Sequence, residues 1–251
     1  MKVAIITGAS SGLGREYARQ VADVFPEIEQ IWLIARRADR LSDVSAECVR
    51  QSKALALDLC SDADLGTLSS DLASEKPEVS VLINCAGCGY LGNVDSTDPA
   101  LFIRSIDLNV RALTAVTCAV LPYMKKGGRI INVSSIASFC PNPRMTVYGA
   151  TKSYISAFTL GLRDELRGRG INVTAVCPGP MDTEFLDIGK ITGNSKMFKT
   201  LPYCVPEKVV SGSLTASRNG RAVWTPKVFF KFYRFIAKIV PHVLLVKMVR
   251  T

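Results

Sequence analysis

The chain has 251 residues with a globular composition, 48% hydrophobic and 21% charged, which excludes a disordered chain. Its formal net charge of +9 sits at one end: residues 208–251 hold nine basic side chains and no acidic one, while residues 1–207 hold 22 of each sign. This distribution excludes a uniformly basic surface, so we expect no binding of nucleic acid.

Signals for targeting and for metal binding are sparse. No apolar run reaches the roughly 18 residues of a membrane span, and the apolar run at residues 3–6 leads directly into a glycine-rich loop. We therefore expect a cytoplasmic protein whose eight cysteines are reduced. The single histidine, His242, and the single CxxC pair, Cys85 and Cys88, argue against a metal site.

Short apolar runs alternate along the chain with segments of helical periodicity. The runs predict strands at Val3–Ile6, Ile31–Ile34, Ala54–Leu57, Val79–Ile83, Arg129–Val133, Ile171–Val176 and Arg221–Trp224. Helices are predicted from about residue 13 to 24, near Asp39–Cys48, from about Pro99 to Met124 and from about Tyr148 to Arg167. This alternation predicts an α/β fold of the Rossmann-like type: a doubly wound parallel sheet of seven strands with helices on both faces, in one domain over residues 1–251.

A glycine-rich loop, Thr7-Gly8-Ala9-Ser10-Ser11-Gly12-Leu13-Gly14, follows the first predicted strand and leads into the first predicted helix. Its glycines allow a tight turn and a close approach of the backbone, and the N-terminus of a helix favours an anion. The loop therefore predicts a phosphate-binding turn for a dinucleotide. The strand before it and the helix after it disfavour the alternative, a flexible turn with accidental glycines.

The second predicted strand ends in Ala35, Arg36 and Arg37. A dinucleotide fold that selects NAD usually places an acidic residue here for the ribose 2′-hydroxyl, whereas an arginine can pair with a 2′-phosphate. We therefore expect NADP(H) to be preferred over NAD(H), through Arg36 first and Arg37 second. The alternative, two solvated arginines at the start of a helix, stays open.

Tyr148 and Lys152 are four residues apart on a predicted helix and so share one face of it. A free tyrosine has a pKa near 10, but an adjacent ammonium group and a positive nicotinamide both favour the phenolate and lower that pKa. Such a tyrosine can exchange a proton with a carbonyl or alcohol oxygen. Ser135, just past the fifth predicted strand, is placed to reach the same oxygen.

These features together resemble the short-chain dehydrogenase/reductase family over nearly the full length of the chain. The matching elements are the glycine-rich loop, Asp58-Leu59, Asn84-Cys85-Ala86-Gly87, Asn109, Ser135, Tyr148-x-x-x-Lys152 and Pro178-Gly179-Pro180-Met181-Asp182-Thr183. The family commonly has Asn at the position of Cys85 and Val or Ile at that of Met181, which are mild departures.

The resemblance implies a role for each position. Tyr148 would be the general acid/base, Ser135 would orient and polarise the substrate oxygen, and Lys152 would lower the tyrosine pKa and bind the nicotinamide ribose. Asn109 would hold a water that connects Lys152 to solvent. The cofactor would contact Gly8, Ser10, Ser11, Gly12, Leu13, Gly14, Asp58, Leu59, Asn84, Ala86, Gly87, Pro178, Gly179, Met181 and Thr183. The cofactor half would span about residues 1–130, and the catalytic and substrate half about 131–225.

The predicted substrate region is apolar. Its candidate residues are Tyr90, Phe139, Met145, Phe185, Met197 and Phe198. They favour a lipophilic ketone or secondary alcohol, such as a hydroxysteroid or bile acid, and a long-chain acyl or other aliphatic carbonyl is the alternative. Packing of these side chains in the core is the simpler interpretation for about half of them.

A basic amphipathic extension is predicted over about residues 226–251. At about 100° per residue, Lys227, Lys231, Arg234 and Lys238 fall within an arc of roughly 60°. Such a helix can lie on an anionic membrane, or it can pack over the substrate cleft or in a subunit contact. We expect a homodimer or homotetramer.

Two classes of function remain open. One is an enzyme that transfers hydride between NADP(H) and a ketone or alcohol, which the complete set of Asn109, Ser135, Tyr148 and Lys152 favours. The other is an NADP(H)-binding regulatory protein or membrane-associated scaffold on the same fold, because a fold does not determine a function.

Overall fold

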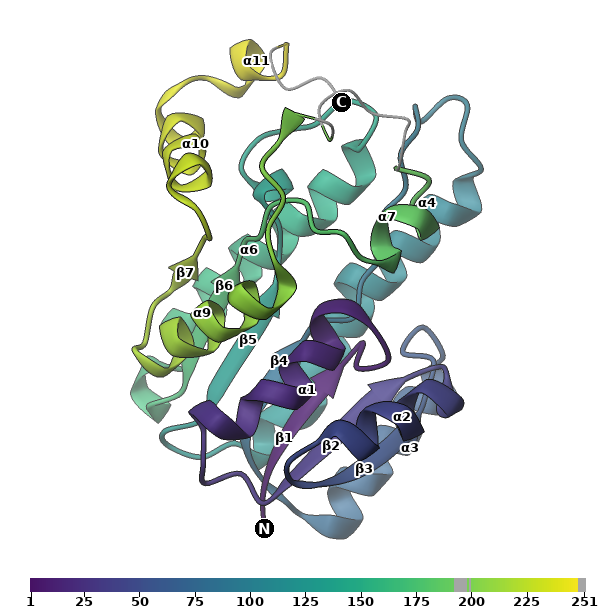
Figure 1. The fold of residues 1–251 in the computed structure, drawn as a ribbon, viewed down its shortest axis with the longest axis vertical. Helices are drawn as coiled ribbons and strands as arrows, with labels where there is room; N and C mark the ends of the chain where they lie inside the picture. Colours follow the sequence, from purple (N-terminus) through teal and green to yellow (C-terminus); the bar gives the residue numbers. More distant parts are fainter. Residues whose placement is uncertain (192–197, 199, 248–251) are drawn as a thin grey trace.

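In the residues that the computed structural model describes, 1–191, 198 and 200–247, seven parallel strands form one sheet (Figure 1). The strands are β1 (Lys2–Thr7), β2 (Gln30–Ala35), β3 (Gln51–Ala56), β4 (Glu78–Asn84), β5 (Arg129–Val133), β6 (Asn172–Val176) and β7 (Val223–Trp224). Their order in space is β3-β2-β1-β4-β5-β6-β7. The predicted fold class is confirmed, although β3 begins at Gln51 instead of Ala54 and β7 has only two residues.

The strand order reverses between β1 and β4, and this reversal places the site. From β1 the chain builds outward to β2 and β3, and from β4 it builds outward the other way. Thr7, the last residue of β1, pairs with Ile34 of β2 and with Asn84 of β4. The three strands therefore end together, and a crevice opens beyond their carboxyl ends, where ligands bind in sheets of this type.

Helices cover both faces of the sheet, as predicted (Figure 1). One face carries α1 (Gly12–Val24), α2 (Ala38–Glu47) and α9 (Pro206–Arg218), and the other carries α3 (Asp62–Glu75), α5 (Leu113–Val120) and α6 (Thr146–Glu165). Each layer has its own buried apolar cluster. Inside the first cluster, the hydroxyl groups of Tyr17 and Ser213 lie 2.6 Å apart and join α1 to α9.

The helix predicted from about Pro99 to Met124 is interrupted in the structure. α4 (Pro99–Ile106) passes into a π-helical turn at Asp107–Ala112, then into α5 and a short 3₁₀ turn at Leu121–Tyr123. π-helical turns inside α-helices are rare and often stand at functional sites. The turn carries Asn109, one of the predicted catalytic residues.

Helices α3 and α9 are absent from the prediction. In α3 the signal is Leu65, Leu68 and Leu72 at helical spacing, preceded by Ser61, whose side chain caps the helix by accepting from the backbone N–H of Asp64 at 3.3 Å. The many serines and aspartates between the leucines hide this periodicity. α9 is signalled by Pro206 at its first position, where proline favours a helix start.

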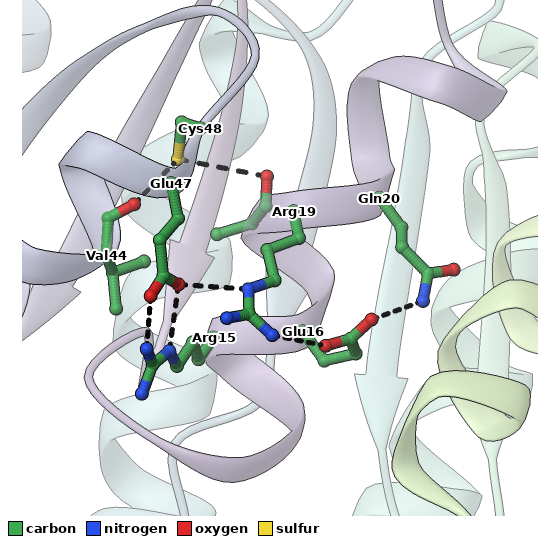
Figure 2. A network of polar contacts seen from close by, with 8 residues as sticks. Arg15, Glu16, Arg19, Gln20, Val44, Glu47 and Cys48 are labelled. Carbon is green, nitrogen blue, oxygen red and sulfur yellow. Dashed lines mark hydrogen bonds and ion pairs between the residues drawn. The ribbon is translucent and has the colours of Figure 1, made fainter.

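Two arginines of α1 hold the end of α2 (Figure 2). The Nε atoms of Arg15 and Arg19 both donate to Glu47 Oε2 at 2.9 Å, and these hydrogen bonds, that of Arg15 first, lower the pKa of Glu47 to about 2. Both arginine side chains are 42% exposed, so solvent screening keeps the stabilisation small. The contacts fix α1, which begins in the glycine-rich loop, relative to α2, which follows Arg37.

The described chain ends in α10 (Val228–Ile239) and α11 (His242–Leu245), with Pro241 between them. α10 runs along one flank of the molecule (Figure 1). Its Phe230 and Ala237 are buried, and Leu245 of α11 packs with Ala237. No helix among the described residues is long and apolar enough to cross a membrane.

Candidate active site

The glycine-rich loop turns tightly because two of its glycines have no room for a side chain. Gly8 has a φ of +70°, and a Cβ there would stand 2.8 Å from the Cα of Ala86. A Cβ on Gly14 would stand 2.0 Å from the carbonyl oxygen of Gly8. Thr7 Oγ1 accepts hydrogen bonds from the backbone N–H groups of Cys85 and Ala86 at 3.0 and 3.1 Å, which fixes the loop to the end of β4.

A cavity of about 440 Å³ lies along this edge of the sheet, and most predicted site residues are on its wall. From the predicted cofactor set, the wall contains Gly8, Ser10, Ser11, Gly12, Leu13, Gly14, Arg36, Arg37, Asp58, Leu59, Ala86, Gly87, Pro178, Gly179, Met181 and Thr183. The catalytic candidates Ser135, Tyr148 and Lys152 share it, as do the substrate candidates Met145, Phe185 and Phe198. One cavity therefore joins the glycine-rich loop, the catalytic side chains and an apolar end.

Asn84 does not face this cavity. Its Nδ2 donates to Thr117 Oγ1 at 3.0 Å and to Asn132 Oδ1 at 2.9 Å, and the side chain is buried. Its side chain is therefore not part of the cavity wall, and its predicted contact with the cofactor stays a prediction. Buried polar side chains need hydrogen-bond partners, and Asn84 finds them in a buried network. The network continues from Asn132, whose Nδ2 donates to Thr159 Oγ1 at 3.0 Å.

Two predicted substrate residues also lie off the wall. The ring of Phe139 packs against that of Tyr233 from α10, with centroids 5.9 Å apart, and so supports the wall from behind. Tyr90 is only partly buried and is not among the described residues that line the cavity. Met197 lies outside the described residues.

Helix α10 supplies wall residues that the predicted substrate set omits. Phe229, Phe230 and Tyr233 line the cavity, together with Leu201 and Ile188. Phe230 is fully buried and lies so close to Gly179 that a Cβ on Gly179 would stand 2.3 Å from its ring. In the sequence, the aromatic residues at helical spacing could have indicated that this helix contributes to the wall. One side of α10 thus covers part of the cavity.

Asn109 stands behind the catalytic pair and fixes the backbone of Cys88. Its Nδ2 donates to the carbonyl oxygen of Cys88 at 2.8 Å and to Thr151 Oγ1 at 2.9 Å, and its Oδ1 accepts from the N–H of Cys88 at 2.9 Å. A Cβ on Gly87 would stand 3.0 Å from Asn109 Oδ1 and 3.4 Å from Lys152 Nζ. Asn109 and Lys152 therefore meet at Gly87, where only the second lone pair of Oδ1 remains to accept from a water.

Tyr148 is held between Gly89 and an aromatic ring. A Cβ on Gly89 would stand 2.3 Å from Tyr148 Cδ2, and the ring of Phe185 lies 5.5 Å from that of Tyr148, centroid to centroid. Burial raises the pKa of Tyr148 to about 12, although a hydrogen bond with Ser135 opposes the rise. The lowered tyrosine pKa expected from the sequence is therefore not a property of the chain alone and needs a positive charge beside the phenol.

Lys152 is a buried cation with unused donors. Its Nζ donates to the carbonyl oxygen of Val133 at 2.8 Å and lies 5.6 Å from the centroid of the Tyr148 ring. Burial lowers its pKa to about 8. An ammonium group has three donors, so two remain for hydroxyl groups in the cavity, and no ion pair joins Lys152 to a carboxylate in the described residues.

The two arginines after β2 differ in their contacts. Arg37 donates to Ser10 Oγ and Ser11 Oγ, both at 3.1 Å, and to Glu184 Oε2 at 3.0 Å. Glu184 also contacts Arg40, and hydrogen bonds from Arg40 and then Arg37 lower the pKa of its carboxyl. Glu184 starts α7 (Glu184–Ile188), so this carboxylate ties α7 to the glycine-rich loop across the cavity.

Arg36 is exposed and lines the cavity, and within the described part of the chain no hydrogen bond or ion pair holds its guanidinium. Ser11, which precedes α1, caps no helix N–H with its side chain. The wall therefore offers an unpaired cation, a helix N-terminus and the unused donors of Lys152. This donor set fits a dinucleotide with negative phosphates near the loop and ribose hydroxyls near Lys152.

Two curated relatives illustrate the range of proteins that this chain is similar to. Sulfoacetaldehyde reductase 2 of Chromohalobacter salexigens is 34% identical over 189 residues, which cover 73% of this chain and 74% of that protein. The very-long-chain 3-oxoacyl-CoA reductase of Homo sapiens is 30% identical over 200 residues, which cover 75% of this chain and 62% of that protein.

Among solved structures, a short-chain dehydrogenase from Sphingobium yanoikuyae in complex with NADPH is 30% identical, with a TM-score of 0.79 over 91% of this chain and 89% of that one. The 3-ketoacyl-(acyl-carrier-protein) reductase of Brucella melitensis, complexed with NADH, is 25% identical, with a TM-score of 0.76 over 90% of this chain and 96% of that one. A family model described as short chain dehydrogenase matches residues 2–188. With the glycine-rich loop, Ser135, Tyr148 and Lys152 on one wall, the chain belongs to the short-chain dehydrogenase family of oxidoreductases, which act on alcohols and ketones.

Proposed function

We propose that this oxidoreductase depends on NADP(H) and interconverts a ketone and a secondary alcohol on a lipophilic substrate of the hydroxysteroid or bile-acid type. The observation that carries the proposal is one cavity whose wall combines the unpaired Arg36, the side chains of Ser135, Tyr148 and Lys152, and several aromatic rings. A long-chain acyl or other aliphatic carbonyl is the alternative substrate.

The catalytic side chains have complementary tasks in ketone reduction. Ser135 Oγ accepts from the N–H of Ala137 at 3.1 Å, and its hydroxyl, which hydrogen bonds with Tyr148, can donate to a substrate oxygen placed beside both side chains. Tyr148, protonated at neutral pH, would give its phenolic proton to that oxygen, and a nicotinamide cofactor held in the cavity would supply the hydride. Lys152 favours the resulting phenolate with its positive charge, and Asn109 keeps the backbone beside it in place.

Preference for NADP(H) rests on the charges around the end of β2. Ala35 stands where an acidic residue would select NAD, and the unpaired Arg36 faces the cavity. Arg37 is already engaged by Glu184, which favours Arg36 as the first contact of a 2′-phosphate. The Sphingobium relative is in complex with NADPH and the Brucella relative with NADH. Membership of the family therefore does not decide the cofactor, and the proposed preference rests on these side chains.

The apolar wall supports the substrate class. Phe185, Leu186, Phe198 and Phe229 line the cavity, and the first three also pack in one apolar cluster with Tyr148. Such a wall favours rings or chains without charge. The human relative, by its name, acts on very-long-chain acyl groups, and the Chromohalobacter relative, by its name, acts on a small anionic aldehyde. The aromatic wall favours a lipophilic substrate, with rings or a long chain, over a small anionic one.

An NADP(H)-binding regulator or scaffold on the same fold is the second candidate. Such a protein would bind the cofactor without turning over a substrate. It would not need Ser135, Tyr148 and Lys152 together on one wall, so their presence favours the enzyme.

A panel of hydroxysteroids, bile acids, aliphatic ketones and small polar aldehydes, followed by NADPH absorbance, tests the substrate class. We expect kcat/KM for the best steroid or bile-acid ketone to exceed that for sulfoacetaldehyde by at least about 100-fold. The reason is that a small polar substrate makes no apolar contact with the aromatic wall. A preference for the small polar aldehydes would overturn the lipophilic assignment. Tight NADPH binding with no turnover of any panel member would favour the scaffold.

Catalysis should depend on the phenol of Tyr148. Tyr148→Phe keeps the ring that packs on Phe185 and deletes only the oxygen that carries the proton. We expect turnover to fall at least about 100-fold while the Kd for NADPH, measured by fluorescence titration, stays within about twofold. Near-normal turnover of this variant is the result that would remove Tyr148 from the mechanism.

Cofactor choice should depend on the end of β2. Ala35→Asp combined with Arg36→Ala supplies a carboxylate for a ribose 2′-hydroxyl and removes the cation for a 2′-phosphate. We expect NADPH to bind about ten- to a hundredfold more weakly, since a charge-assisted contact is worth roughly 1.5–3 kcal/mol, and NADH to bind as well or better. Equal affinity of the unaltered protein for NADPH and NADH would contradict the preference.

Glu184 should weaken NADP(H) binding in the unaltered protein, because its carboxylate engages Arg37 and adds negative charge beside the phosphate-binding loop. Glu184→Gln should therefore strengthen NADPH binding about two- to fivefold, a range set by the partial exposure of the pair, and leave NADH nearly unchanged. The matched control is Glu47→Gln, which removes an arginine-paired carboxylate away from the cavity. Weaker NADPH binding in Glu184→Gln would show instead that Glu184 positions Arg37 for the phosphate.

A further inference from the structure

Helix α10 is apolar on two opposite sides. Its inner side carries Phe230 and Ala237, which are buried against the body of the protein. Its outer side carries Val228, Phe232, Phe235 and Ile239, whose side chains are 59–79% exposed. A surface helix normally turns a polar side to water, and one that is apolar around most of its circumference is normally covered on both sides. The outer side therefore lacks a covering layer in the described part of the chain.

Positive charges border this apolar strip. At about 100° per residue, Lys231 and Lys238 lie next to each other at one margin of the strip formed by Val228, Phe232, Phe235 and Ile239. Both lysines are exposed, as are Lys227 before the helix and Lys247 after it. None of the four forms an ion pair with a carboxylate of residues 1–191, 198 or 200–247. The charges are free to meet an anionic partner.

We propose that the outer face of α10, defined by Val228, Phe232, Phe235 and Ile239 with Lys231 and Lys238, docks on the surface of an anionic lipid bilayer. An apolar strip with lysines at its margin is the arrangement by which a helix lies in a membrane interface, with its aromatic side chains among the acyl chains and its cations at the headgroups. Val243 and Leu244 of α11 are exposed as well and extend the apolar surface.

Charge decides between a bilayer and a second copy of this chain. The whole net charge of +9 lies in residues 208–251, so two copies meeting through their α10 helices would bring like charges together. An anionic bilayer turns the same charges into attraction. The absence of a membrane-crossing helix among the described residues fits a peripheral contact.

The docking face adjoins the cavity, so a docked protein would hold the cavity next to the bilayer. Phe229 lines the cavity and is 54% exposed, and it lies next to Val228 of the docking face. Phe229 and Phe230 are in edge contact, with ring centroids 5.4 Å apart, so the helix that meets the bilayer also forms the cavity wall. A substrate dissolved in the bilayer would enter beside Phe229; this last step rests on the proposed lipophilic substrate, whereas the docking does not.

The test is co-sedimentation of the full chain with vesicles of phosphatidylcholine, with and without phosphatidylglycerol. We expect binding to the anionic vesicles at low salt, and a steep loss at high salt, where the screening length falls from about 10 Å to about 3 Å. Phe232→Ser with Phe235→Ser should weaken binding at least about tenfold. Lys231→Gln with Lys238→Gln should weaken it about 25-fold, about fivefold for each cation.

The matched control is Val49→Ser with Val94→Ser. It removes two apolar side chains of similar exposure, 67% and 58% against 63% and 59% for Phe232 and Phe235, at positions outside α10, and should leave vesicle binding unchanged. None of these six residues lines the cavity, so turnover of a water-soluble ketone and the Kd for NADPH should stay the same in all three double variants and verify that they fold.

Three results would overturn the docking proposal. One is no binding of the unaltered protein to anionic vesicles at low salt. Another is binding that the α10 variants do not weaken. The third is a dimer in solution that Phe232→Ser with Phe235→Ser dissociates, which would assign the face to a second copy. Failure of the substrate panel leaves vesicle binding intact, so the two proposals fail separately.

Discussion

The site depends on a buried hydroxyl at the point where the strand order reverses. Thr7 is 2% exposed, and its Oγ1 accepts from two consecutive backbone N–H groups at the end of β4. This contact holds the ends of β1 and β4 together, and the glycine-rich loop leaves from one of them while Cys85 to Gly87 leave from the other. The anion-binding turn and the backbone beside Lys152 are therefore placed by the same few atoms.

Burial shifts the pKa values of Tyr148 and Lys152, the two central groups of the candidate active site, in opposite directions. It disfavours the phenolate of Tyr148 and the ammonium of Lys152 at once, so their pKa values of about 12 and about 8 lie farther apart than the ordinary values of 10.0 and 10.5, and in the reverse order. A tyrosine that is protonated at neutral pH is a proton donor, which suits ketone reduction. A bound cofactor with positive charge would shift this balance toward the phenolate, so the direction of proton transfer follows the state of the cofactor.

Patterns local in the sequence predicted the sheet and the glycine-rich loop, because each is encoded within a single strand–helix unit. They also singled out Ser135, Tyr148 and Lys152, which the structure brings to one cavity wall. Arg36 and Tyr148 could be identified from the residues next to them in the sequence. The substrate wall was less accessible: Phe139 and Tyr90 lie near the right loops but face elsewhere, and Phe229 comes from a helix whose position only the packed structure defines. The inward position of the Asn84 side chain was not predictable for the same reason, since its partners Thr117 and Asn132 come from other elements.

The contact between Phe230 and Gly179 has a consequence for how the protein assembles. The two residues are 51 positions apart in the chain, yet a missing side chain on one is what admits the ring of the other. While the chain is being synthesised, the loop after β6 stays open on this side until α10 has emerged and docked. Between its emergence and its docking, α10 exposes both of its apolar sides, so a lipid surface or a chaperone that shields it during this interval would protect the chain from aggregation.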